Sequence, residues 1–170
     1  MNAEILDKRN EAENNCYLCK ISLFDFITNL PEDYKNYDIQ REIVSNIYLD
    51  SLVDTVLNFR HIPPIVLVIE KNNYKVQKSN LEISAFKILD GLQRTYRLKI
   101  IWDTIQFFEK LLKEDKNFIK LNRLQLSKKF SDKLYNINSS SKVLSYLIDF
   151  HQKHRTTDLK TCYQRQFSMV

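Results

Sequence analysis

The sequence predicts an α+β domain in which a small mixed sheet, in residues 37–90, is followed by a mostly helical C-terminal part. Two observations predict this class. Extended runs rich in β-branched residues cluster before Gly91, whereas apolar residues recur at helical spacing after it. With 170 residues, of which 44% are hydrophobic and 28% charged, the chain is long enough to bury a core as one domain.

The N-terminal part predicts little regular structure. Residues 1–20 are expected to be a lead-in, frayed or in a short helix, because the first fifteen positions are polar and lack a period. Residues 21–30 (ISLFDFITNL) are apolar enough to pack, and Pro31 ends them. The main domain is expected to span residues 21–112, and residues 113–170 to be its helical extension.

The middle of the chain predicts a strand, a helix and then more strands. Residues 37–44 (YDIQREIV) are expected to form a short strand or extended segment that carries Gln40 and Arg41. Apolar residues at helical spacing in residues 47–59 predict an amphipathic helix. Pro63 and Pro64 stop that helix and begin an extended run, and further strands are expected at 74–77 and 83–89, joined by a loop at 78–81.

The C-terminal half predicts helices. An apolar stripe that includes Trp102 and Phe108 predicts a long helix over residues 92–112. A shorter basic helix, a loop rich in Asn and Ser at 136–141 and a final helix over 143–154 complete the chain.

Composition excludes several classes of protein. No apolar run approaches the roughly 18 residues that a membrane span needs, so no membrane partner is expected. Met1 and the residues after it lack the pattern of a secretory signal, and three cysteines are an odd number for a disulfide framework. The expected localisation is therefore cytoplasmic.

The glycine content is unusual, because the chain has one glycine, Gly91. It stands where a strand is expected to give way to the long helix. The first N–H groups of a helix and its dipole attract anions, and a glycine lets a ligand approach the backbone. Arg94 and Arg97 in the first turns suit phosphate oxygens, Asp90 suits a metal or a ribose hydroxyl, and Gln93 can orient a water. The alternative is a plain turn in which Asp90 caps the helix and the arginines are solvated.

The segment Asp90-Gly91-Leu92-Gln93-Arg94 resembles the DGQQR or DGQHR signature of the ParB/sulfiredoxin-like superfamily. The surroundings are similar to one branch, the N-terminal domain of GmrSD- and SspE-type restriction proteins, known as domain of unknown function 262. That branch has a YQR segment, an amphipathic helix, IPPIVL and then the signature. Here residues 38–41, 49–59, 62–67 and 90–94 follow the same order.

The resemblance implies a compact ParB-like fold that binds a nucleotide, with NTP and Mg²⁺ as ligands, in DNA restriction or phage defence. Gln40, Arg41, Gly91, Arg94 and Arg97 would bind the phosphates, and Asp90 and Gln93 would be catalytic in NTP hydrolysis. Leu92 replaces the family's first glutamine, and leucine can neither activate water nor attack phosphorus, which excludes sulfiredoxin chemistry. The chain ends before a nuclease domain could fit, so nuclease action is expected to come from a partner protein, unless this chain is a fragment of a longer protein.

A basic window supports a rival hypothesis. Residues 110–133 hold eight Lys or Arg against three acids, and the whole chain carries a net charge of +5. A DNA-binding regulator would use the glycine turn together with Lys120, Arg123, Lys128 and Lys129 on backbone phosphates. The window is equally typical of a solvated helical face. A second alternative is a catalytically inactive interaction module of a partner nuclease.

Cysteine and histidine patterns are weaker signals. Cys16 and Cys19 form a CxxC motif, and together with His151 and His154 they provide the four ligand types of a Cys₂His₂ zinc site. The two halves are 131 residues apart in the sequence, so no zinc or other metal site of this kind is expected. The cysteines are expected to be reduced and packed in the core.

Overall fold

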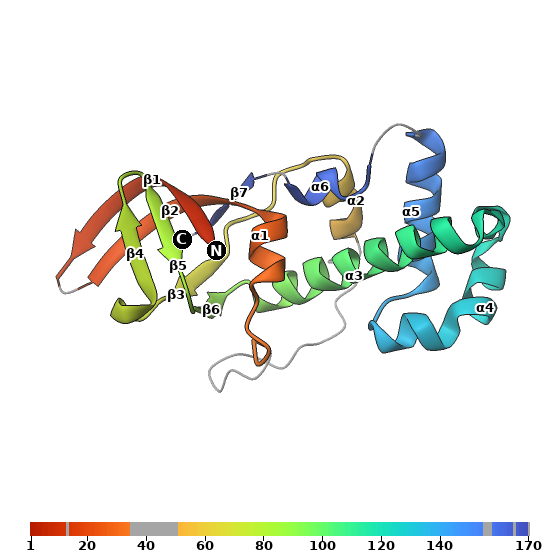
Figure 1. Cartoon of the computed structure of the whole chain (residues 1–170), viewed down its shortest axis with the longest axis horizontal. Coiled ribbons are helices and arrows are strands. Elements are labelled where there is room, and N and C mark those ends of the chain that lie inside the picture. The colour runs from red at the N-terminus through yellow and green to blue at the C-terminus, as the bar shows by residue number, and fades with distance from the viewer. Residues whose placement is uncertain (13, 35–50, 155–157, 165, 170) are drawn as a thin grey trace.

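The computed structural model describes residues 1–12, 14–34, 51–154, 158–164 and 166–169. The molecule is elongated, with a β part at one end and a helical part at the other (Figure 1). Helix α3 (Leu92–Glu114) connects the two parts. Its 23 residues span about 34 Å at 1.5 Å per residue.

Five strands form the main sheet in the order β4-β5-β1-β2-β7. The strands are β1 (Asn2–Glu11), β2 (Asn14–Ser22), β4 (Tyr74–Gln77), β5 (Asn80–Ile83) and β7 (Gln166–Met169). Every described pair is antiparallel, with Glu4 opposite Lys20 and Cys19 opposite Met169. The expectation of a mixed sheet was therefore wrong.

The N-terminal lead-in is in fact a β-hairpin, β1–β2, so the prediction of a frayed or helical segment was wrong. Strand β1 is almost entirely exposed, and Ala3 is its one fully buried side chain among those described. The strand is stable because its backbone pairs with β2 on one side and β5 on the other. The sheet also extends past residues 37–90 at the C-terminal end, where β7 pairs with β2.

A second, two-stranded sheet pairs β3 (Val66–Val68) with β6 (Lys87–Asp90), also antiparallel. The expected strand over 83–89 is broken, because β5 ends at Ile83 and β6 begins at Lys87. The expected loop over 78–81 is shorter, since Asn80 already pairs with Gln77. The strand at 74–77 is confirmed as β4.

The helices largely follow the sequence. They are α1 (Leu23–Thr28), α2 (Leu52–Leu57), α3, α4 (Arg123–Asn136), α5 (Ser141–Lys153) and α6 (Thr161–Gln164), with 3₁₀ turns η2 (Lys71–Asn73) and η3 (Lys116–Lys120). The long, basic and final helices are thereby confirmed as α3, α4 and α5. Helix α2 lies within the predicted 47–59 helix, and the expected strand at 37–44 lies outside the described residues.

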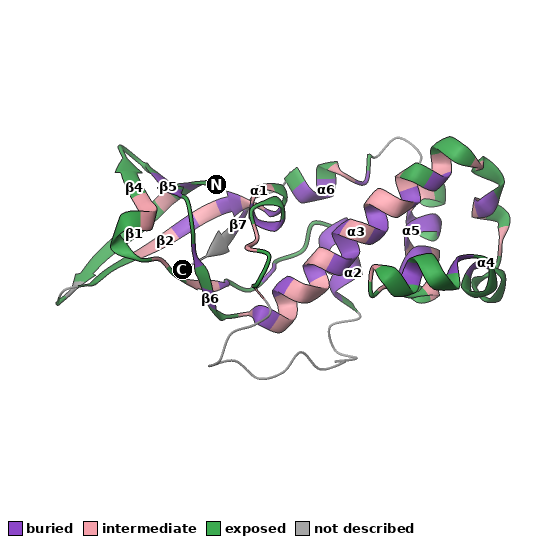
Figure 2. Ribbon diagram, turned by 60° about the horizontal axis from the view of Figure 1, so that its bottom comes forward, coloured by how far each residue is buried: buried purple, intermediate pink, exposed green. Residues whose placement is uncertain are grey.

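Helix α3 is the centre of the core. Its apolar stripe, including Leu98, Ile101, Ile105 and Phe108, is completely buried (Figure 2). Helices α1, α2 and α5 all contact it. The hydroxyl of Tyr163 on α6 is buried too and donates to the Leu98 carbonyl at 2.7 Å. The α+β class and the helical C-terminal part are therefore confirmed.

None of the helices in the described ranges is long and apolar enough to cross a membrane.

Candidate functional site

The turn between β6 and α3 requires a glycine. Asp90 ends β6 opposite Val66 of β3, and α3 begins at Leu92. Gly91 between them has φ +94° and ψ 15°, in the left-handed region that side chains disfavour. A Cβ on Gly91 would lie 3.1 Å from Cγ1 of Ile65 and 3.3 Å from Nη1 of Arg94. The turn is therefore closed tightly by its neighbours as well as by its backbone conformation.

The guanidinium of Arg94 folds back on this turn. Its Nη1 donates to the carbonyl oxygens of Pro63 at 3.2 Å and Pro64 at 3.0 Å. These bonds join the first turn of α3 to the segment that leads into β3. A guanidinium has five N–H donors, and both bonds use the same nitrogen. Within the part of the chain that the structure describes, Nε and Nη2 of Arg94 have no protein partner.

The first backbone N–H groups of α3 lie at the same turn as the Arg94 guanidinium. The first hydrogen bond of the helix runs from Thr95 N–H to the Gly91 carbonyl at 2.8 Å. The N–H groups of residues 92–94 precede it, so the helical ladder does not use them. Gly91 itself is the N-cap and has no side chain to accept from them. The alternative in which Asp90 caps the helix is therefore wrong.

The other residues predicted for this site differ in how far their side chains are exposed, and two of them lie outside the described residues. Asp90 is exposed at the end of β6, and Gln93 is half-buried in the first turn of α3. Leu92 is buried, at 5% exposure, so its side chain packs in the core. Gln40 and Arg41 lie outside the described residues. Of the predicted set, the structure therefore brings together Asp90, Gly91, Gln93 and Arg94.

Arg97 faces a different set of residues, one helical turn further along α3. It lines a pocket of about 440 Å³ between α2, α3 and α5. The other residues that line this pocket are Ser51, Val53, Asp54, Lys142, Val143 and Tyr146. Sequence reasoning did not find this grouping, because it comes from three helices far apart in the chain.

Asp54 is the polar centre of that pocket. It accepts a hydrogen bond from the Tyr146 hydroxyl and forms an ion pair with Nη1 of Arg60 at 2.6 Å. Burial, and then the hydrogen bond to Asp54, raise the pKa of Tyr146 to about 12. Tyr146 therefore stays a hydrogen-bond donor at neutral pH, and the pair connects α2 to α5.

The basic residues lie at the opposite end of α3 (Figure 1). Lys120 ends η3, and Arg123, Lys128 and Lys129 lie on α4, all with exposed side chains. Lys129 pairs with Asp115 at 3.2 Å. Lys120, Arg123 and Lys128 have no acidic partner among the described residues. The glycine turn and the basic surface are therefore separate surfaces, and one compact site cannot contain both.

The cysteine and histidine pairs do not converge. Cys16 and Cys19 lie on β2, and His151 and His154 lie near the end of α5, at the other end of the molecule (Figure 1). Residues three apart on an extended strand are separated by roughly 10 Å, beyond the reach of a disulfide. Burial raises the pKa of Cys19 to about 11, so it is a protonated, packed thiol.

No protein-family model, curated protein or solved structure matches the chain. The resemblance in residues 90–94 therefore stays a prediction.

Proposed function

We propose that this protein binds a nucleotide through its phosphates at the N-terminal turn of α3. The observation that carries the proposal is the guanidinium of Arg94. Two carbonyl groups hold its Nη1, which lies 3.3 Å from the position of a Cβ on Gly91. Its Nε and Nη2, which have no protein partner among the described residues, lie near the first N–H groups of the helix. An anchored guanidinium and a helix N-terminus provide charge and directed donors for phosphate oxygens.

Hydrolysis, if the bound nucleotide is cleaved, would depend on Asp90 and Gln93. The exposed carboxylate of Asp90 is the side chain in the turn that suits Mg²⁺. Gln93, in the first turn of α3, would orient the water. Leu92 takes no part, since its side chain is buried. Binding therefore has stronger structural support than catalysis.

The biological setting of this proposal comes from the resemblance to restriction proteins. In that setting the chain would act in DNA restriction or phage defence and would regulate a nuclease on a partner protein. The cytosol is the compartment we propose, because it contains nucleoside triphosphates and keeps thiols reduced. Cys16, Cys19 and Cys162 are free thiols.

A thermal-shift screen with ATP, GTP, CTP and UTP, with and without Mg²⁺, tests binding. A nucleotide at 100 times its dissociation constant adds about 2.7 kcal/mol of stability, a shift of several degrees. Arg94→Gln is expected to abolish the shift, whereas Arg97→Gln is expected to leave it unchanged, because Arg97 lines the separate pocket between α2, α3 and α5. Arg123→Gln removes the same charge from an exposed site on α4 and is the matched control.

The comparison separates binding from folding. Arg94→Gln also removes two hydrogen bonds, so its unliganded melting temperature is measured alongside the shift. A variant that remains folded and loses the shift supports the proposal. Absence of a shift for wild type with every nucleotide contradicts it, as does an equal shift in wild type and Arg94→Gln.

The second candidate function is nucleic-acid binding by the basic surface. Three exposed cations favour it, namely Lys120, Arg123 and Lys128, none of which has an acidic partner in the described part of the chain. Affinity for duplex DNA would fall steeply with salt, and Lys128→Gln would reduce the slope of log K against log salt by about one. Since this surface is separate from the glycine turn, Arg123→Gln would weaken DNA binding and leave nucleotide binding unchanged.

A protein that binds neither nucleotide nor DNA would fit the third proposal, an inactive interaction module of a partner nuclease. Co-purification with a nuclease as a defined complex would then be the supporting result.

A further inference from the structure

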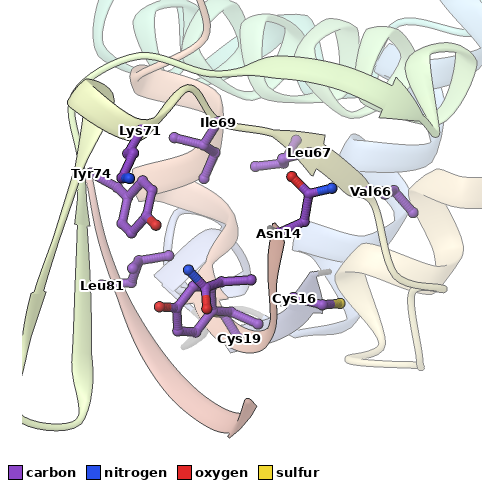
Figure 3. Close-up of a pocket in the computed structure, with 11 residues that line it drawn as sticks. Asn14, Cys16, Cys19, Val66, Leu67, Ile69, Lys71, Tyr74 and Leu81 are labelled. Carbon is purple, nitrogen blue, oxygen red and sulfur yellow. The ribbon is translucent and has the colours of Figure 1, made fainter. Parts of the chain in front are cut away.

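A second cavity, of about 390 Å³, lies in the β part of the molecule, between the main sheet and β3 (Figure 3). None of the residues that line it belongs to the turn at Asp90–Arg94. Its walls come from β2, β4 and β5 on one side and from β3, the segment after it and η2 on the other. The residues that line it are Asn14, Asn15, Cys16, Tyr17, Cys19, Val66, Leu67, Ile69, Lys71, Tyr74 and Leu81.

Two tyrosines from distant strands of the main sheet meet at the cavity. Tyr17 on β2 and Tyr74 on β4 are three strands apart in the sheet order, a backbone separation of about 14 Å at roughly 4.8 Å per strand. Their ring centroids are 6.0 Å apart, in an edge-to-face arrangement. The two side chains therefore approach each other over the face of the sheet that β3 and η2 cover from the other side.

The lining is apolar and aromatic, with a positive charge at its rim. Leu67, Ile69 and Leu81 provide aliphatic surface, and Figure 3 shows Lys71 beside Tyr74 with Leu67 and Ile69 across the top. Among the described residues that line the cavity, none has an acidic side chain. Lys71 is exposed and has no acidic partner in the described part of the chain.

Polar side chains also lie at the cavity. Asn14 and Asn15 supply amides that both donate and accept hydrogen bonds. A second ammonium, Nζ of Lys8, lies 5.5 Å from the ring centroid of Tyr17. The side chains at this site are therefore suited to a flat ring that carries a negative charge, with amide groups to orient it.

We propose that this cavity binds a small aromatic carboxylate of one or two rings. Its volume of about 390 Å³ lies at the low end of ligand pockets, which typically measure about 300–1,000 Å³. The ring would lie against the tyrosine edges and the aliphatic wall, and the carboxylate would pair with Lys71. This site does not depend on the nucleotide proposal, since it shares no residue with the α3 turn.

Cys16 is an exposed thiol at the edge of the cavity, on the opposite face of β2 from Tyr17, so a bound ligand that covers this edge slows its alkylation. Cys19 and Cys162 are buried, and burial raises the pKa of each to about 11, so both react slowly at neutral pH. Alkylation of Cys16 by N-ethylmaleimide is followed by mass spectrometry of the intact chain while 2-naphthoate is titrated. We expect a saturable slowing of at least about fivefold.

Two comparisons test the chemical class of the ligand. The neutral amide, 2-naphthamide, is expected to bind at least about tenfold more weakly than 2-naphthoate. Lys71→Met keeps the length of the side chain and is expected to lower the affinity for 2-naphthoate by about tenfold, because one charge-assisted contact is lost. Lys75→Met is the matched control, since Lys75 is exposed on β4 and alternation points it to the opposite face from Tyr74.

The proposal is overturned if 2-naphthoate neither slows alkylation of Cys16 nor binds saturably by isothermal titration calorimetry. It is also overturned if naphthamide binds as well as naphthoate, or if Lys71→Met and Lys75→Met have the same affinity as wild type. Weakening by both lysine variants equally would show general charge attraction and would contradict a carboxylate seated at Lys71.

Discussion

Two side chains meet at Gly91: Ile65 approaches from the segment after Pro64, and Arg94 from the first turn of α3. Each lies within about 3.4 Å of where a Cβ would be, and the φ of +94° disfavours a side chain independently. The single glycine of the chain is therefore explained by the packing around it and by its backbone conformation. The anchored guanidinium of Arg94 is the feature that packing alone does not require.

Gly91→Ala is expected to lower the free energy of unfolding by about 1–3 kcal/mol, because the new Cβ must shift Ile65 and adopt a left-handed backbone. Urea denaturation followed by circular dichroism measures it. Lys78→Gly is the opposite case, since Lys78 has φ 55° in the β4–β5 turn. It is expected to leave stability unchanged or raise it by about 0.5 kcal/mol. Equal effects of the two substitutions would contradict this account of Gly91.

The helices could be predicted from the sequence because a helical stripe is a local signal. Residues 92–112 show the apolar period of α3 directly, and the buried side chains follow it. The N-terminal hairpin could not be predicted in the same way. Strand β1 buries almost nothing, so its pattern resembles a polar loop, and pairing with distant β5 stabilises it. Strand β7 depends likewise on a partner about 150 residues away in the chain, since Phe167 pairs with Ile21.

The same contrast applies to the candidate site. The turn at residues 90–94 was predictable because its residues are contiguous in the sequence. The hydrogen bonds from Arg94 to the carbonyls of Pro63 and Pro64 could not be predicted from the sequence, because they depend on how β3 pairs with β6. The cluster of Asp54 and Tyr146 joins residues 92 apart, with no local pattern to reveal it.

The capping box of α4 offers a test at the level of one element. Asn122 Oδ1 accepts from Gln125 N–H at 2.9 Å, and Gln125 Oε1 accepts from Asn122 N–H at 2.9 Å. Asn122→Ala removes the acceptor of the Gln125 N–H but keeps the backbone N–H that donates to Gln125 Oε1, and it is expected to cost about 1 kcal/mol in urea denaturation. Asn136→Ala, at the exposed C-terminal end of the same helix, should cost less than about 0.5 kcal/mol. A larger cost at Asn136 than at Asn122 would contradict the assignment of the cap.

At the scale of the whole molecule, α3 separates two kinds of surface. Its N-terminus adjoins the sheet, the glycine turn and β3, which also forms one wall of the aromatic cavity. Its C-terminus leads into η3 and α4, where the exposed cations gather. Substitutions at one end should therefore leave binding at the other end unchanged.

The folded chain is expected to lose stability in alkaline solution. Burial raises the pKa of Cys19 and Cys162 from 9.0 to about 11, and of Tyr146 from 10.0 to about 12. Burial also raises the pKa of Tyr34 and of Tyr163 above its ordinary value. Above about pH 9 the unfolded chain therefore holds fewer protons than the folded chain, so the free energy of unfolding falls as pH rises. These contributions are fully present below the unfolded pKa values.

Urea denaturation at intervals from pH 8 to 11 measures this effect. Tyr163→Phe removes one of the groups and is expected to reduce the slope above pH 10, although it also removes the hydrogen bond to Leu98. A free energy of unfolding that stays constant from pH 8 to 11 in the wild type would contradict the burial of these groups.

Phosphate binding at the N-terminus of α3 is tested most directly by a titration of ¹⁵N-labelled protein with ATP, GTP, CTP or UTP in the presence of Mg²⁺, followed by two-dimensional NMR. If phosphates bind at the N-terminus of α3, at least one nucleotide shifts the NMR signals of the Leu92 and Gln93 backbone amides and of the Arg94 Nε–H most strongly, and these changes saturate together. Changes confined to η3 and α4, or no saturable change with any of the four nucleotides, would contradict a phosphate site at the N-terminus of α3.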